Sequence, residues 1–90
     1  MASGLKGMNV EQGRALSKSM LSNSDTIAGI TSQLQNQLMN TEWLGQDADQ
    51  FRDAWNSEYS KALKTVAQAL ATASTHLSRE ADAQDQASNS

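Results

Sequence analysis

Residues 41–47 of the 90-residue chain read Thr-Glu-Trp-Leu-Gly-Gln-Asp, and they lie at its centre. On either side is a long segment whose apolar residues have helical spacing. The tripeptide Trp43-Leu44-Gly45 places a large aromatic residue and a glycine between these two segments. Glycine adopts the left-handed conformation that ends a helix without steric cost. The stretch therefore predicts a helix-to-helix corner, at which the chain folds back on itself.

The segment before the corner predicts a first helix over about residues 9–41. Asn9 is suited to cap this helix, and Gln12, three residues on, completes a capping-box-like pair. The large apolar residues form a stripe about 80° wide. They are Leu16, Met20, Ile27, Ile30, Leu34 and Leu38. The polar residues between these positions are expected to form a solvated face. They include Ser17, Ser24 and Thr31.

The segment after the corner predicts a second helix over about residues 46–82, with Asp47 and Asp49 in its first turn. Its apolar line follows spacings of three and four residues, which predict one nearly straight helix. The line consists of Ala48, Phe51, Trp55, Tyr59, Ala62, Val66, Leu70, Ala73 and Leu77. The charged side chains of Arg52, Asp53, Lys61 and Lys64 are expected to face away from it. Residues 83–90 have no large apolar residue and are expected to form a flexible tail.

These elements predict an all-α fold, in which residues 1–90 form a single antiparallel helical hairpin. The apolar stripe of the second helix is about 120° wide, more than one partner helix covers. Leu21 and Met39 also lie off the main line of the first helix. We therefore expect two hairpins to dimerise into a four-helix bundle. Its core or dimer interface is predicted at Leu16, Met20, Ile27, Ile30, Leu34, Leu38, Phe51, Trp55, Tyr59, Val66 and Leu70.

The composition excludes several classes of protein. The chain has no cysteine, so neither a disulfide framework nor a thiolate metal site is possible. Its net charge of −3 argues against a nucleic-acid-binding protein. No stretch approaches the roughly 18 apolar residues of a membrane span, so no stable membrane insertion is expected. The start of the chain also has no apolar run typical of a secretory signal peptide, which predicts a leaderless protein and, taken alone, a cytosolic one.

No residues form a recognisable catalytic constellation. No nucleophile has a base at helical spacing, and the Asp47, Asp49 and Asp53 cluster is typical of a solvated helix start. His76 is the only histidine, and its neighbour one turn on, Glu80, gives it a single carboxylate. A metal site usually needs three or four ligands. We therefore expect no enzymatic activity, no metal site and no cofactor.

With about forty residues of helix on each side of Trp43-Leu44-Gly45, the chain resembles the WXG family. This family comprises small helical-hairpin proteins, typified by the early secreted antigens of mycobacteria. Chain length, the central tripeptide, the flanking helices, and Phe51 and Trp55 after the glycine all carry the resemblance. It covers nearly the whole chain, from about residue 9 to residue 77.

The resemblance implies a helical hairpin that forms homodimers, or heterodimers with a paralogous WXG protein. It also implies export by a type VII (ESX or Ess) secretion system without a cleaved signal peptide, so that the protein is secreted and only transiently cytoplasmic. Some members of the family are virulence effectors, and others act as chaperones for a partner. By this resemblance Trp43, Leu44 and Gly45 form the turn and secretion motif, in a surface offered to the secretion ATPase or to the partner.

The end of the chain departs from the family pattern. Many members carry a Tyr-x-x-x-Asp/Glu export signal after the second helix, whereas this chain has no tyrosine after Tyr59. His76 and Glu80 are the nearest equivalent and resemble a histidine-acid pattern found in some members. Either this pair takes part in the export signal or a partner chain supplies the signal.

Other interpretations remain open at this point. Trp43 also suits a purely structural role, as a hydrophobic residue that closes the end of the bundle, and His76 with Glu80 suits a solvated i,i+4 pair. The alternative function is a cytosolic hairpin adaptor that binds a partner helix and is not exported. A membrane-active protein is less favoured, because the polar faces carry serine, glutamine and acidic residues rather than lysine and arginine.

Overall fold

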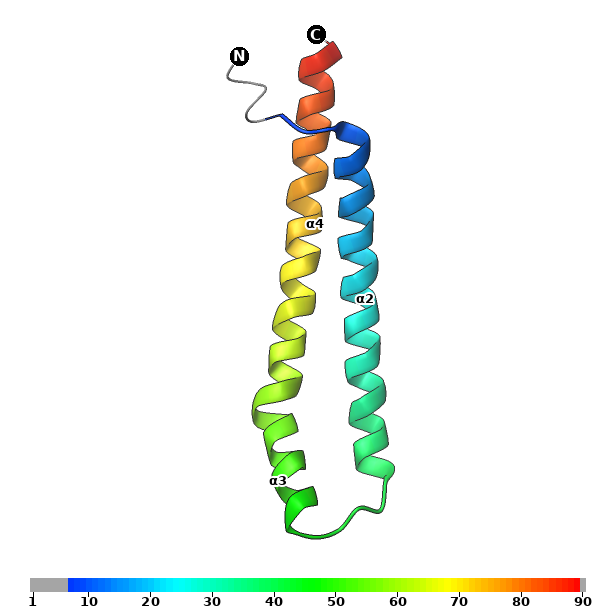
Figure 1. The fold of residues 1–90 in the computed structure, drawn as a ribbon, viewed down its shortest axis with the longest axis vertical. Helices are drawn as coiled ribbons and strands as arrows, with labels where there is room; N and C mark the ends of the chain where they lie inside the picture. The colour runs from blue at the N-terminus through cyan, green and yellow to red at the C-terminus, as the bar shows by residue number, and fades with distance from the viewer. Residues whose placement is uncertain (1–6, 90) are drawn as a thin grey trace.

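The computed structural model describes residues 7–89 and is a long antiparallel hairpin (Figure 1). Helix α2 spans Val10–Asn40, and after the corner come α3 (Gln46–Ala54), the short π-helix η1 (Trp55–Tyr59) and α4 (Ser60–Asn89). The hairpin measures 65 × 20 × 13 Å, and α4 packs along α2 for most of its length. The all-α hairpin predicted from the sequence is confirmed, and its second arm is divided by the π-helix.

The starts of the helices follow the predicted signals, whereas the end of α2 does not. The Asn9 side chain accepts a hydrogen bond of 3.0 Å from the backbone N–H of Gln12 and thereby caps α2. Gly45 was expected to end the first helix in the left-handed conformation, but α2 ends at Asn40 and the next residue, Thr41, is extended. Gly45, with a φ of 116° and a ψ of 175°, is instead the N-cap of α3, and this positive φ favours glycine. Asp47 and Asp49 lie in the first turn of α3, where carboxylates favourably oppose the positive end of the helix dipole.

The contact between α2 and α4 is made by small residues, which corrects one expectation from the sequence. We call this buried line the seam. It comprises Ser17, Ser24 and Thr31 on α2 and Ser60, Ala67, Ser74 and Ala81 on α4. On each helix the members recur every seven residues, so they stay on the side that faces the partner helix. The three α2 residues were expected on a solvated face and are instead buried, as is Gly13 of the same helix.

Hydroxyl groups satisfy their hydrogen bonds within this seam. Ser17 Oγ donates to the backbone oxygen of Ser74 over 2.7 Å, and Ser74 Oγ donates to that of Ser17 over 2.8 Å. Ser24 Oγ donates to the backbone oxygen of Ala67 over 2.6 Å. In each of these bonds a hydroxyl of one helix contacts the backbone of the other. Such contacts are possible only where the side chains are small and the helices lie close together. The seam therefore specifies how α2 and α4 are aligned.

The π-helix inserts one residue into the second arm. The backbone N–H of Ser60 donates to the oxygen of Trp55, five residues back, rather than to the residue four back. From the Ser24–Ala67 bond to the Gln35–Trp55 bond, α2 advances by eleven residues while the second arm retreats by twelve. The expectation of one unbroken, nearly straight helix is thus wrong at Trp55–Tyr59, because its apolar spacing alone does not reveal the extra residue.

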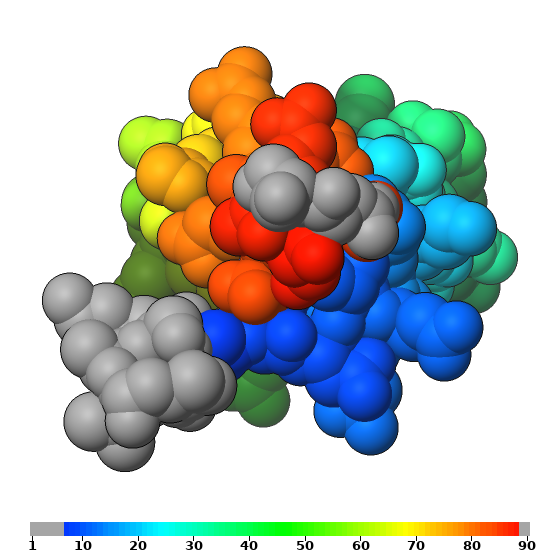
Figure 2. Space-filling model, turned by 90° about the horizontal axis from the view of Figure 1, so that it is seen from above, coloured from blue at the N-terminus to red at the C-terminus, as the bar shows by residue number. Residues whose placement is uncertain are grey.

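Helix α4 continues to Asn89, seven residues beyond the predicted end, in the region expected to be a flexible tail. Ala81 is fully buried in the seam, and Arg14 forms ion pairs with Asp82 and Asp85 at 3.0 and 3.3 Å. Hydrogen bonds to Asp82 and Asp85 raise the pKa of Arg14 above its ordinary value. In Figure 2, which looks onto this end of the hairpin, the last turns of α4 lie against the first turns of α2. Residue 90 of the predicted tail lies outside the described residues.

Candidate protein-binding face

The positions beside the seam fall on two opposite sides of the hairpin. In an α-helix the residues three after and one before a seam position lie on one flank, and those four after and one after lie on the other. Because α2 and α4 are antiparallel, the same flank of both helices lies on the same side of the hairpin. The residues at these flanking positions therefore decide whether each side of the hairpin is apolar or polar.

One side carries most of the large apolar residues, and we call it the apolar face. It comprises Leu16, Ile30, Leu34, Phe51, Tyr59 and Val66, all of which are exposed. Leu16, Ile30 and Val66 keep 51, 49 and 48% of their surface accessible. In the described residues, the buried apolar side chains are only Ala48, Trp55, Ala67 and Ala81. Most of the large apolar side chains thus lie outside the seam, on one side of both arms.

The eleven residues predicted as core or dimer interface separate into three groups. Trp55 is buried between the arms, where its indole N–H donates to Oε1 of Gln35. Met20, Ile27 and Leu70 are half-buried along the edge of the seam, and Leu38, seven residues after Thr31, is half-buried at its corner end. The remaining six are the apolar face, so they are not the internal core of the hairpin. Two helices have one seam, and serine and alanine occupy it.

At the corner end the apolar face continues as a row of aromatic rings. The ring centroids of Trp43 and Phe51 are 5.9 Å apart, and those of Phe51 and Tyr59 are 6.1 Å apart, both with tilted geometry. Trp43 keeps 40% of its surface accessible, and the neighbouring Leu44 keeps 81%. The corner tripeptide thus offers one ring packed into the aromatic row and one aliphatic side chain that projects into solvent.

Arg52 holds the corner in shape, a role that the sequence analysis missed. Its guanidinium donates to three backbone oxygens at the end of α2 and in the corner: Leu38 at 3.1 Å, Thr41 at 2.9 Å and Trp43 at 2.7 Å. The guanidinium carbon also lies 5.7 Å from the centre of the Trp43 ring. Carbonyls at a helix C-terminus lack partners within the helix and attract cations.

The expectation that Arg52 faces away from the packed side is therefore wrong. No local pattern indicates this contact, because Arg52 reaches across the corner to carbonyls 9 to 14 residues earlier. The only usable signal is the absence of a basic residue in the last turn of α2 itself, which leaves its carbonyls to be capped from elsewhere.

His76 and Glu80 lie on α4, far from the tripeptide. Both side chains are exposed, and the structure describes no hydrogen bond or ion pair between them. From Gly45 to His76 the second arm rises by about 45 Å at 1.5 Å per residue. A single hairpin thus does not bring the candidate export pair and the corner motif together, and only another chain could do so.

Within residues 7–89, no three histidine, cysteine or acidic side chains are placed to hold a metal ion. Over the same residues, no helix is long and apolar enough to cross a membrane. Comparisons of the chain with protein-family models, with curated proteins and with solved structures found no match.

Proposed function

We propose that this protein acts by protein–protein binding through its apolar face, as a WXG-type hairpin that dimerises into a four-helix bundle. The observation that supports this is the exposed band of large apolar side chains across both arms. A contiguous apolar patch on a water-soluble surface marks an interaction site more often than not. The hairpin outline of 65 by 20 Å has room for about 800 Å² of interface per partner, which is the standard size of a stable complex.

The kind of partner follows from the shape of the face. Two parallel ridges of apolar side chains, one on each arm, fit two further helices crossing at about 20°. A second copy of the chain, or a paralogous WXG protein, offers such a pair of ridges. We propose that its binding buries Leu16, Ile30, Leu34 and Val66 together with Phe51 and Tyr59, and leaves Trp43 accessible at the end of the bundle.

Export by a type VII secretion system is the second part of the proposal. Its support is the resemblance of the chain around Trp43-Leu44-Gly45 to the WXG family, together with the exposed position of the tripeptide at the end of the hairpin. In this proposal the secretion ATPase or the partner chain contacts the corner, and the protein leaves the cell as a secreted substrate, an effector or a chaperone of its partner. His76 and Glu80 contribute to the export signal unless the partner supplies it.

Sedimentation equilibrium at micromolar concentration tests the dimer. We expect a mass near twice the 9.7 kDa of the chain for the native sequence. Ile30→Glu and Val66→Glu each place a carboxylate in the middle of the apolar face and should shift the mass toward the monomer. Gln33→Glu is the matched control, because Gln33 is exposed and points away from the seam. A helical, folded monomer of the native chain would contradict the dimer.

Secretion assays in a strain with a working type VII system test the export. Trp43→Arg should reduce the secreted fraction while the helix content and the mass of the complex stay unchanged. Gln33→Arg introduces the same side chain at an exposed position of α2 outside the corner and should be exported normally. Normal export of the Trp43→Arg variant would count against the proposal.

The alternative function is a cytosolic adaptor that uses the same apolar face to bind a partner helix and is never exported. The exposed band favours this function as well, because nothing in a band of apolar side chains requires secretion. Detection of the protein only inside cells that secrete other type VII substrates would select the adaptor.

A further inference from the structure

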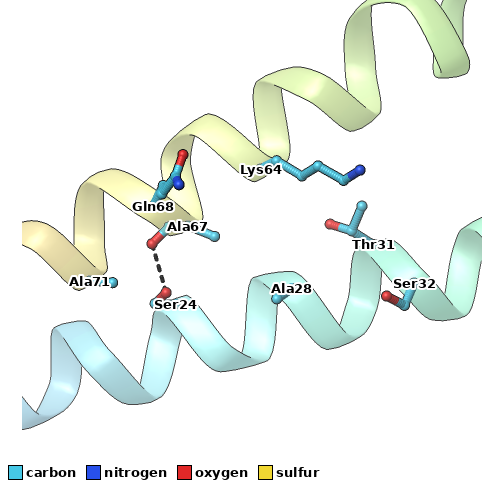
Figure 3. Close-up of a pocket in the computed structure, with 8 residues that line it drawn as sticks. All are labelled: Ser24, Ala28, Thr31, Ser32, Lys64, Ala67, Gln68 and Ala71. Atoms are coloured by element: carbon cyan, nitrogen blue, oxygen red, sulfur yellow. Dashed lines mark hydrogen bonds between the residues drawn. The ribbon is translucent and has the colours of Figure 1, made fainter.

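The side of the seam opposite the apolar face is hollow. Two adjoining cavities lie there, of about 440 and 430 Å³, each open to solvent between α2 and α4. Figure 3 shows the first, with Ala28 and Ser32 on one wall, Lys64 and Gln68 on the other, and the Ser24–Ala67 hydrogen bond across its floor. The second continues the first toward the chain termini.

The two cavities form one groove. On α4 the wall positions Lys64, Gln68, Ala71 and Thr75 follow one another at spacings of four, three and four residues, so they stay on one flank of the seam. On α2 the lining runs from Ser17 to Ser32. At 1.5 Å per residue the groove is about 22 Å long, which is the length of four helical turns.

The groove is open because its flanking positions carry small residues where the apolar face carries large ones. Ala28 lies four residues after Ser24, whereas the larger Ile27 lies three residues after it and is half-buried on the other side. Ala71 and Leu70 differ in the same way on α4. The floor of the groove is the seam itself, so the backbones of both helices are close to its surface.

The charged residues that line the two cavities are all basic, although Asp25, one residue after Ser24, lies on the same flank outside both linings. Lys64 lines the first cavity, Lys18 and Arg79 line the second, and neither lining contains an acidic residue. The chain as a whole has ten acidic and seven basic residues. In the described residues none of these three side chains forms an ion pair, whereas Arg14 at the end of the hairpin forms two. The lining of the groove is thus basic, although the net charge of the protein is negative.

We propose that this basic groove binds an acidic amphipathic helix of a partner protein, independently of the apolar face. The partner helix lays small and aliphatic side chains against Ala28, Ala71 and Leu21, and its carboxylates meet Lys18, Lys64 and Arg79 at the rim. The groove is straight, as long as four helical turns and floored by small residues, which suits a third helix packed on the first two.

Other classes of ligand fit less well. An extended peptide adds to a sheet edge through free backbone groups, whereas the groove walls are helices whose backbone groups are paired internally. A nucleic acid would meet three cations on a molecule of net charge −3, and the overall field repels a polyanion. The backbone groups of an acidic helix are hydrogen-bonded within the helix, and the helix carries far fewer negative charges than a nucleic acid.

A designed peptide serves as the probe. It has 18 residues, alanine and leucine on one face, glutamate along both edges of that face, and a fluorescent label. We expect it to bind the full chain, with anisotropy rising on titration and amide shifts confined to residues 17–32 and 64–79. Increased salt should weaken the binding, because the ion pairs lie at a solvated rim. The same peptide with lysine in place of glutamate should not bind.

Variants of the protein locate the site. Combined Lys18→Glu, Lys64→Glu and Arg79→Glu should weaken the peptide affinity by about tenfold or more, since each rim charge pair contributes modestly. Lys64→Glu alone should weaken it more than Lys61→Glu, a matched change of an exposed lysine outside the lining. Ala28→Trp fills the groove without changing its charge and should also block the peptide. Ile30→Glu on the apolar face should leave peptide binding intact.

Several outcomes would overturn this proposal. They are equal binding of the acidic and basic peptides, an affinity unchanged in the triple variant, amide shifts on the apolar face instead of the groove, and tighter binding of a DNA duplex than of the acidic peptide. Concentration-dependent shifts of the groove amides in the protein alone would assign the groove to a second copy of the chain and overturn it as well.

Discussion

The two ends of this hairpin are stabilised by different kinds of contact. Along the part where α4 packs against α2, which we call the shaft, serine hydroxyls donate to the backbone of the facing helix across a seam of small residues. At the corner, a buried tryptophan and an arginine bridge the arms with the largest side chains available. The π-helix separates the two halves and supplies the extra residue between their registers. The comparison teaches that close packing of small residues joins the two arms in the shaft, whereas long side chains join them at the corner.

The largest expected effect is at the corner. Trp55→Ala should lower the free energy of unfolding by about 3–5 kcal/mol, because it removes the one large side chain that is buried among residues 7–89 and its bond to Gln35. Leu44→Ala is the control in the corner, where the side chain is 81% exposed and lies outside the apolar face. Its cost should be clearly smaller. Urea unfolding followed by circular dichroism at one fixed protein concentration measures both.

In the shaft, the free energy of unfolding should be most sensitive to a larger side chain in the seam. Ser24→Leu should destabilise by about 1–3 kcal/mol, because the larger side chain forces α2 away from Ala67. Ser22→Leu makes the same change at an exposed position of α2 and should lie within about 0.5 kcal/mol of the native chain. If Ser24→Leu were neutral, the shaft would not depend on close approach, and the contrast with the corner would fail.

A smaller effect is expected from the backbone at the corner. Gly45→Ala should cost on the order of 1–2 kcal/mol, because φ is 116° there, although the added methyl group meets no neighbour within 4 Å. Gly29→Ala in α2 has the same open surroundings and helical φ, so it should stabilise by about 0.5–1 kcal/mol. Thermal and urea unfolding should give opposite signs for the two variants. A loss of stability in Gly29→Ala would contradict this pair.

The smallest effect is expected at the open end of the shaft. Arg14→Gln removes the ion pairs to Asp82 and Asp85 on a solvated surface. Global stability should barely change, while amide hydrogen exchange at residues 82–89 should become faster because the end of α4 frays more readily. Lys18→Gln is the control on the same helix. Unchanged exchange in Arg14→Gln would leave Ala81 alone as the reason why α4 extends to Asn89.

The sequence predicts the elements better than it predicts which of their sides meet. Asn9 and the acidic start of α3 act locally, so their roles follow from neighbouring residues. The seam residues cannot be identified from their neighbours in this way. Ser24 and Ile27 both lie on regular helical lines, about 60° apart, and the larger, apolar residue is normally the buried one. With only one partner helix, the smaller residue allows the closer approach. Arg52 and the π-helix depend on contacts across the corner and leave no local pattern.

The π-helix also sets the rotational phase between the corner and the shaft. The second arm advances by twelve residues from Trp55 to Ala67, and a regular α-helix would turn these two side chains about 120° apart. The π-turn takes up the extra residue, so both side chains face α2. Deletion of one residue among Asn56, Ser57 and Glu58 leaves eleven, which a regular α-helix aligns to within about 20°, so a chain shortened by one codon keeps the seam and the aromatic row without the π-turn.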